Sequence, residues 1–189
     1  VLFRSDSQKA DVIILGSGDD TVTFTGGSDN VTLGAGADTF NFNSKAGSNN
    51  MGTAGLTFVF ASTDSVADKD AGSGLSKGIS ATKTDTITGF EVATFAAAAG
   101  AKFTIDTDKS ATSVDVVTSA VNFGTTTVSA ANGFLVVNDT ANNAAYVFQD
   151  TNGNSIIDNG EFAVKLVGTV ALAAGEFSVV SGNLVFTSV

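Results

Sequence analysis

Four aspartates recur at a fixed interval near the start of the chain, because Asp11, Asp20, Asp29 and Asp38 lie nine residues apart. Calcium takes six to eight oxygen ligands, so a single aspartate cannot complete a site. Glycines precede the last three aspartates, as the pairs Gly16 and Gly18, Gly26 and Gly27, and Gly34 and Gly36. Glycine can adopt positive φ and turn its backbone carbonyl inward, which supplies further oxygens. The repeat therefore predicts calcium-binding turns.

A second acidic stretch, residues 150–161, matches the 12-residue calcium loop of EF-hands. The matching ligand positions are 1, 3, 5, 9 and 12, occupied by Asp150, Asn152, Asn154, Asp158 and Glu161, with the backbone carbonyl of Ile156 at position 7. The departure is Ser155 at position 6, where a glycine usually makes the sharp turn. Since Asp and Asn are common turn formers, a polar hairpin turn without metal is the alternative.

Strand-forming pairs follow each of the four repeated aspartates and would position them. These apolar-x-apolar pairs are Ile13 and Leu15, Val22 and Phe24, Val31 and Leu33, and Phe40 and Phe42. Residues two apart share one face of a strand, and a single nonapeptide cannot bury such a pair without stacking on others. The period predicts a parallel roll of short strands joined by glycine turns.

Two nonapeptides should complete one turn of such a roll, which places residues 18 apart on the same side. Asp20 then faces Asp38, and Asp11 faces Asp29. The second pair is the weaker candidate, because Lys9 occupies a glycine position in the first copy. A glycine-rich turn repeat with solvated aspartates and no metal is the alternative.

The rest of the chain alternates short apolar segments with turn residues, as antiparallel sheets do. We expect strands at 56–61, 84–92, 103–105, 114–117, 125–128, 133–138, 144–149, 161–167, 176–180 and 183–186, a surface loop at 62–80 and a short helix at 93–100. The predicted fold class is all-β, with a parallel β-roll over 6–61 and an antiparallel, sandwich-like C-terminal domain over 81–189. Residues 1–5 resemble the translated end of a sequencing adaptor, so we expect the chain to be a fragment and leave these residues out of the fold prediction. A natural start is the alternative.

Composition excludes several functions. The formal charge is −10, with 19 acidic and 9 basic residues, so we expect no binding to nucleic acid. Cys and His are both absent, which removes disulfides, thiol nucleophiles, histidine bases and the usual zinc sites. The aspartates belong to repeat turns that explain them without a catalytic pocket. We therefore predict that this segment is not an enzyme.

Over residues 11–42 the nonapeptides resemble Gly-Gly-x-Gly-x-Asp-x-U-x, the repeat of the RTX (hemolysin-type) calcium-binding proteins, where U is a large apolar residue. A leucine or phenylalanine replaces the first glycine in each copy. A weaker echo over 85–90 looks like the segment that closes such a roll. The resemblance implies Ca²⁺ as the bound ion, an extracellular or cell-surface location and export through a type I secretion channel.

Two functions remain open after this comparison. The first is a module whose calcium-triggered folding and secretion serve a larger extracellular bacterial protein. The second is a structural module of an adhesin or surface layer that self-associates in calcium. Exposed apolar strand edges would favour the second function.

Overall fold

Short strands with alternating inward and outward side chains make up the computed structural model of the chain, which describes residues 2–4, 12–24, 30–32, 38–42, 56–60, 84–88, 102–118, 121–168 and 172–187. The strands are β1 (Leu2–Arg4), β2 (Val12–Ile14), β3 (Thr21–Phe24), β4 (Asn30–Thr32), β5 (Thr39–Phe42), β6 (Leu56–Phe60), β7 (Asp85–Thr88), β8 (Lys102–Thr107), β9 (Val114–Val117), β10 (Phe134–Asp139), β11 (Ala144–Gln149), β12 (Phe162–Val167), β13 (Phe177–Val180) and β14 (Asn183–Thr187). Two 3-10 helices, η2 (Thr140–Asn142) and η3 (Ala174–Glu176), accompany them, and the described ranges contain no α-helix. The protein is therefore all-β, as the sequence predicts. No helix in these ranges is long and apolar enough to span a membrane.

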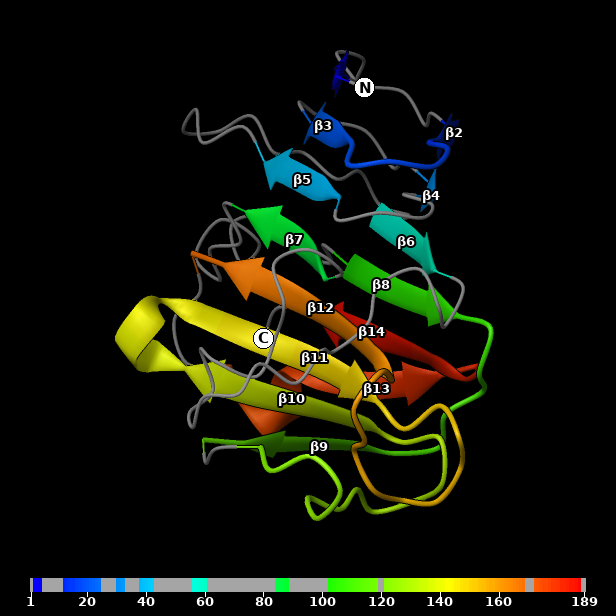
Figure 1. Cartoon of the computed structure of the whole chain (residues 1–189), viewed down its shortest axis with the longest axis vertical. Helices are drawn as coiled ribbons and strands as arrows, with labels where there is room; N and C mark the ends of the chain where they lie inside the picture. Colours follow the sequence, from blue (N-terminus) through cyan, green and yellow to red (C-terminus); the bar gives the residue numbers. More distant parts are fainter. Residues whose placement is uncertain are drawn as a thin grey trace.

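The strands form two mixed sheets (Figure 1). The eight-stranded sheet has the order β1-β3-β5-β7-β12-β11-β10-β9, and the six-stranded sheet has the order β13-β14-β8-β6-β4-β2. From β1 to β8, successive strands alternate between the two sheets, and every pairing among them is parallel. This alternation is the predicted parallel roll.

The register of the first turns follows the nonapeptide period. Val12 pairs with Asn30 in one sheet, and Thr21 pairs with Thr39 in the other. Residues 18 apart therefore lie side by side, as the sequence predicts for two nonapeptides per turn. The period then breaks, but β7 and β8 still add to the same two ladders in parallel.

Both sheets continue without interruption from the roll into the C-terminal half. Strand β12 joins β7 in parallel, and β14 joins β8 in the antiparallel sense. The pairs β10–β11, β11–β12 and β13–β14 are antiparallel, as expected, whereas β9 pairs with β10 in parallel. Strands from both 6–61 and 81–189 therefore belong to each sheet. The division of the chain into two domains at these bounds stays a prediction.

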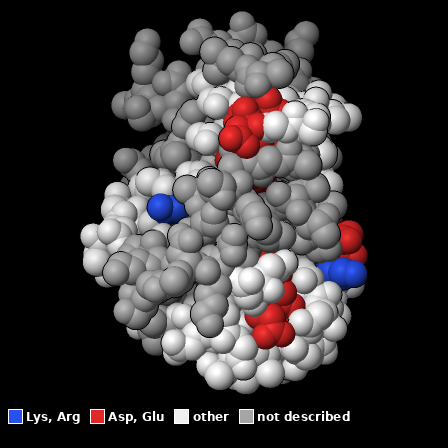
Figure 2. Space-filling view, viewed as in Figure 1, with Lys and Arg blue, Asp and Glu red and all other residues white. Residues whose placement is uncertain are grey.

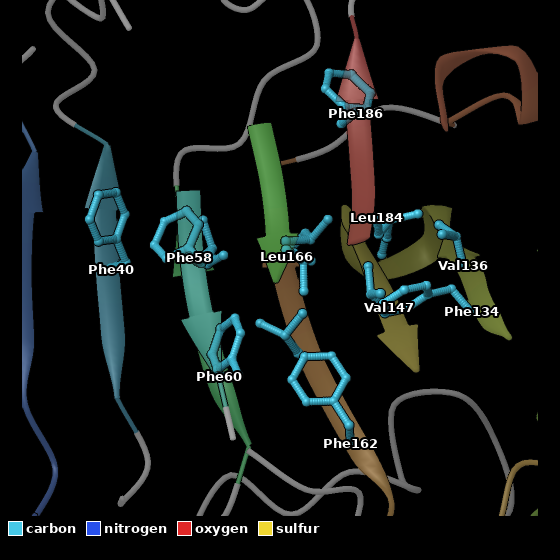
Figure 3. Close-up of a cluster of buried hydrophobic side chains, with 14 of the residues drawn as sticks. Phe40, Phe58, Phe60, Phe134, Val136, Val147, Phe162, Leu166, Leu184 and Phe186 are labelled. Atoms are coloured by element: carbon cyan, nitrogen blue, oxygen red, sulfur yellow. The ribbon is translucent and has the colours of Figure 1, made fainter. Parts of the chain in front are cut away.

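The core lies between the sheets and contains buried residues from the roll and from the C-terminal half. Figure 3 shows part of it, including Phe40, Phe58 and Phe162. Ile13 is only 2% exposed, whereas its neighbours Val12 and Ile14 are 75% and 73% exposed. The equivalent residues of later strands are buried as well, namely Val22, Val31, Phe40, Phe58, Ile87 and Ile105. Phe40 meets Phe58 edge to face, and Phe60 meets Phe162 of the C-terminal half. One apolar residue per nonapeptide therefore builds a core shared by both halves.

A second, smaller cluster covers the opposite face of β10–β12. Its buried members include Leu135, Val137, Tyr146, Phe148 and Ile157. Phe123 packs against this cluster and meets the ring of Phe148 edge to face. The segments that carry Phe123 and Ile157 are irregular, so loops rather than a third sheet shield this face.

One expectation about local structure is wrong. Residues 125–128 form no strand but a single bridge, between Thr127 and Ile156, because the N–H groups of Thr125 and Thr126 donate to the carbonyl of Asn122, while the carbonyl of Thr126 and the N–H of Val128 pair with the loop that follows β11. Leu2–Arg4 forms β1 and pairs with β3 in parallel. The interpretation of residues 1–5 as an adaptor remnant stays a prediction. The predicted helix at 93–100 and loop at 62–80 lie outside the described residues.

Candidate metal sites

Aspartates stack on one side of the roll, at the start of consecutive strands of the eight-stranded sheet. The backbone N–H of Asp20 donates to Oδ1 of Asp38 at 2.8 Å, as the 18-residue spacing predicts. The N–H of Asp38 in turn donates to Oδ1 of Asp85 at 2.8 Å. Backbone bonds run alongside, from Thr39 to the carbonyl of Asp20 and from Thr86 to that of Asp38. We call Asp20, Asp38 and Asp85 the aspartate ladder.

The ladder is buried. Asp20 is 4% exposed, Asp38 is 1% exposed and Asp85 is fully buried. Oδ2 of Asp38 and of Asp85 is also shielded from solvent. Figure 2 shows acidic side chains gathered near the upper and the lower middle of one face, with a further acidic side chain beside a basic one at the edge of the view. Because buried carboxylates repel each other and lose hydration, this stack favours a compensating cation.

Asp85 was missed as a site residue by the sequence reasoning, which treated residues 85–90 only as a closing segment. A usable signal was present, because Asp85 begins the same Asp-Thr-apolar triplet that begins at Asp20 and at Asp38. Each triplet places its aspartate at the strand entrance, its threonine outward and its apolar residue in the core. The long insertion before Asp85 hid this third copy from a search at a fixed period.

Of the other predicted roll ligands, only Gly16 and Gly18 lie within the described residues. Asp11, Gly26, Gly27, Asp29, Gly34 and Gly36 lie outside the described residues, so the predicted site at Asp11 and Asp29 stays a prediction. Gly16 and Gly18 form the exposed turn between β2 and β3. Gly18 has φ of 106°, a conformation that side chains other than glycine rarely adopt, which explains the glycine there.

The second predicted site is the connection between β11 and β12, at 150–161. The flanking strands pair in register from Gln149 opposite Phe162 to Ala144 opposite Val167, which confirms a hairpin rather than two helices. Asp150 is fully buried at the loop entrance. Its Oδ1 accepts the N–H of Gly153 at 2.8 Å, and its Oδ2 accepts the N–H of Ser155 at 2.8 Å. The first carboxylate therefore organises the turn.

Alternate side chains continue this inward arrangement around the loop. Asn152 Oδ1 accepts the N–H of Asn154 at 3.0 Å, and Asn154 Oδ1 accepts the N–H of Ile156 at 2.8 Å. The side-chain amides of both asparagines donate to Oδ2 of Asp158, at 3.0 and 2.8 Å. The predicted ligands at positions 3, 5 and 9 are therefore joined through their side chains.

Glu161, at position 12, closes the loop. Its Oε1 accepts the N–H groups of Thr151 and Asn152 at 3.0 and 3.2 Å, and its Oε2 accepts that of Asp158 at 2.7 Å. Burial raises the pKa of the Glu161 carboxyl above its ordinary value, the three N–H groups lower it, and the charge of Asp150 raises it again. The pKa of this carboxyl therefore lies above its ordinary value chiefly because the group is buried.

The departure at position 6 keeps the required backbone conformation. Ser155 has φ of 62°, in the left-handed region where glycine is normally favoured. Ile157, at position 8, is fully buried in the smaller cluster, as its apolar character predicts. The loop thus has the expected turn despite the serine.

Donor chemistry decides whether these residues fit a metal ion. Within the described residues, no three Asp, Glu, His or Cys side chains come together as a metal-binding group. The loop instead combines carboxylates with amide and carbonyl oxygens, and both oxygens of Asp150 already accept two N–H groups each. An all-oxygen donor set suits Ca²⁺ rather than zinc or copper. The residues therefore fit calcium by chemistry.

Comparison with known proteins adds little to this picture. No protein-family model and no curated protein matches the chain. The AlgE6R2 subunit of the Azotobacter vinelandii mannuronan C5-epimerase is similar in structure, with TM-score 0.44 and 20% identity over 90% of this chain and 85% of that chain. The AlgE6R3 subunit of the same enzyme gives TM-score 0.45 and 19% identity over 95% and 86%. Both the identities and the TM-scores are too low to assign a function to this chain.

Proposed function

We propose that this chain is a calcium-binding β-roll module of a larger exported bacterial protein, and that calcium drives its folding. The observation that carries the proposal is the aspartate ladder, in which three carboxylates from consecutive turns of the roll are buried in a stack. Without a cation their repulsion opposes folding. An ion that binds only the native state stabilises it by about 2.7 kcal/mol at a hundredfold excess over the dissociation constant.

The loop at 150–161 supports a second calcium position. Asp150, Asn152, Asn154, Asp158 and Glu161 would supply side-chain oxygens, and Ile156 would supply its carbonyl. When bound, calcium supplies positive charge that offsets the carboxylates. The chain's own residues set the turn, bury Asp150 and hold the side chains inward. Binding rather than catalysis is the role we infer for these acids.

Titration calorimetry in chelator-treated protein tests the calcium assignment. We expect calcium to bind more tightly than magnesium, because the larger ion accepts the irregular oxygen sets of flexible sites. Asp20→Ala should remove part of the binding heat, whereas Asp108→Ala, at an exposed position, should not. A calcium titration without heat above dilution would contradict the proposal.

Export through a type I channel is the second part of the proposal. It is supported by the resemblance to RTX proteins, the absence of Cys and the acidic repeats placed before a β-rich C-terminal half. A passenger fused ahead of residue 130 should reach the medium when a type I channel is co-expressed. Retention of the passenger in the cytoplasm with a working channel would rule this part out.

Self-association in calcium is the alternative, as in an adhesin or surface layer. The observation that favours it is the last strand of the six-stranded sheet, β2, where Val12 and Ile14 are 75% and 73% exposed. Light scattering separates the two functions. Lasting monomers in calcium support the secretion module, whereas calcium-dependent polymers that disappear in Val12→Ser/Ile14→Ser support assembly.

A further inference from the structure

The predicted calcium loop does not stand alone but pairs with residues 122–128, which we call the support segment. The N–H of Ile157 donates to the carbonyl of Thr126 at 2.8 Å, and the N–H of Gly124 donates to the carbonyl of Ile157 at 2.9 Å. The N–H of Val128 donates to the carbonyl of Ser155 at 3.0 Å. The backbone groups on both sides of the Ile156 carbonyl are therefore fixed by the support segment.

The support segment has its own anchors on the body of the protein. The ring centroids of Phe123 and Phe148 lie 6.0 Å apart, in an edge-to-face arrangement. Val128 is only 6% exposed and belongs to the smaller cluster. Immediately after the segment, both the N–H and the hydroxyl of Ser129 donate to the carboxylate of Asp115 on β9, at 2.7 and 2.6 Å. These contacts hold the segment without using any predicted calcium ligand.

A further contact ties the chain beyond the segment to the first ligand. The N–H of Asn132 donates to Oδ2 of Asp150 at 3.0 Å, while its carbonyl accepts the side chain of Gln149 at 3.1 Å. Gln149 is fully buried and accepts the hydroxyl of Thr107 at 2.7 Å, at the end of β8. The loop is therefore held at both its first position and its middle by residues between 122 and 132.

We propose that the support segment positions the Ile156 carbonyl for calcium, so that ion binding in the loop and ordering of 122–128 are one coupled event. This inference rests on the proposed calcium function. A 12-residue connection is long enough to be mobile by itself, and fixing it costs conformational entropy. Because the support segment already fixes the middle of the loop, the loop loses less conformational entropy when the ion binds. Conversely, an ion held by the loop stabilises the bonds that hold the segment.

The test uses the full chain and compares Phe123→Ala with Phe177→Ala. Phe123 anchors the support segment, whereas Phe177 makes a similar aromatic pair with Phe186 in the other sheet. The amide signals of Gly153 and Ser155 report ion binding in the loop separately from the roll during a calcium titration by NMR. We expect Phe123→Ala to weaken loop binding roughly tenfold, which corresponds to about 1.4 kcal/mol, and Phe177→Ala to leave it within twofold.

Hydrogen exchange provides the second readout. In the unmodified protein, calcium should slow exchange of the Gly124 and Val128 amides together with that of Ile157, since these amides bond across the contact. Glu161→Gln should abolish this calcium effect. Unchanged loop affinity in Phe123→Ala, or exchange at Gly124 and Val128 that ignores calcium while the loop binds it, would overturn the coupling. Absence of any calcium shift at Gly153 and Ser155 in the unmodified protein would instead overturn the loop's assignment as a calcium site.

Discussion

The carboxylate of Asp85 accepts a hydrogen bond from the backbone N–H of Asp38 at 2.8 Å, although 47 residues separate them in the sequence. Asp38 holds the N–H of Asp20 in the same way, so one contact is repeated along the roll. A residue outside the nonapeptides is therefore part of the ladder. The calcium response of the roll should depend on Asp85 as it does on Asp38.

Replacing Asp85 with alanine should lower the free energy of unfolding in calcium. The change removes the acceptor for the Asp38 N–H at a buried position, which costs about 1–3 kcal/mol. Urea denaturation in excess calcium measures the loss. Asp85→Asn is the matched control, because it keeps an acceptor oxygen but loses the charge, and it should narrow the stability difference between calcium and chelator. Wild-type denaturation midpoints for Asp85→Ala in both conditions would show that the ladder is unimportant.

Replacing Glu161 with glutamine should abolish calcium binding in the loop and leave the roll unaffected. In the proposed site the carboxylate at position 12 would supply two oxygens to the ion, and an amide cannot replace its charge. NMR titration separates the two regions, with the amide of Gly153 reporting the loop and that of Thr39 reporting the roll. Calcium shifts at Gly153 that persist in Glu161→Gln would contradict this role.

Replacing Ser155 with glycine should preserve or strengthen calcium binding. Ser155 adopts φ of 62°, which costs a residue with a Cβ about 1 kcal/mol relative to glycine. Removing this strain should also raise the thermal unfolding midpoint in calcium. Scanning calorimetry checks the second effect, and Thr118→Gly, at an exposed position outside the loop, serves as the comparison. Weaker binding in Ser155→Gly would mean that the serine side chain contributes to the site.

The single tyrosine of the chain offers a clean probe of packing beneath the loop. Burial, and next the charge of Asp139, raise the pKa of the Tyr146 phenol above 10.0. The pKa of the Tyr146 phenol is thus higher in the folded protein than in the unfolded protein. The contribution of the protonated phenol to the free energy of unfolding is therefore fully present below the unfolded-state pKa, and it is lost as the pH rises through the folded-state pKa. Ultraviolet titration should place the midpoint above 10.0 in the folded protein. Asp139→Asn should lower it only partly, and a midpoint equal to that of urea-unfolded protein would contradict the burial.

The period of the sequence predicted the roll because every nonapeptide carries its own core residue and its own turn. Val22 and Phe40 are both fully buried, as spacing alone required. The hairpin around 150–161 could also be predicted. The spacing of the expected ligands indicates a loop there, and the apolar alternation on both sides indicates two strands. These features are local, and each repeats information that the neighbouring residues already contain.

The pairing of segments that lie far apart in the chain could not be predicted from the sequence in this way. Nothing in the local pattern of 162–167 indicates that β12 pairs with β7 in parallel and extends the sheet of the roll. Residues 125–128 have strand-like composition, yet the carbonyl of Thr126 and the N–H of Val128 pair with the loop at 155–157. Asp85 was missed because a fixed period cannot cross a long insertion. In each case the deciding interaction joins segments far apart in the chain.

Hydrogen exchange of the roll amides, in calcium and in chelator, tests the central claim most directly. Thr39 and Thr86 donate to the carbonyls of Asp20 and Asp38, so their amides report whether the ladder is formed. We predict slow exchange of both amides in millimolar calcium and fast exchange in chelator, because repulsion among the buried carboxylates then opens the roll. Equal protection of both amides in the two conditions would contradict a calcium-dependent fold.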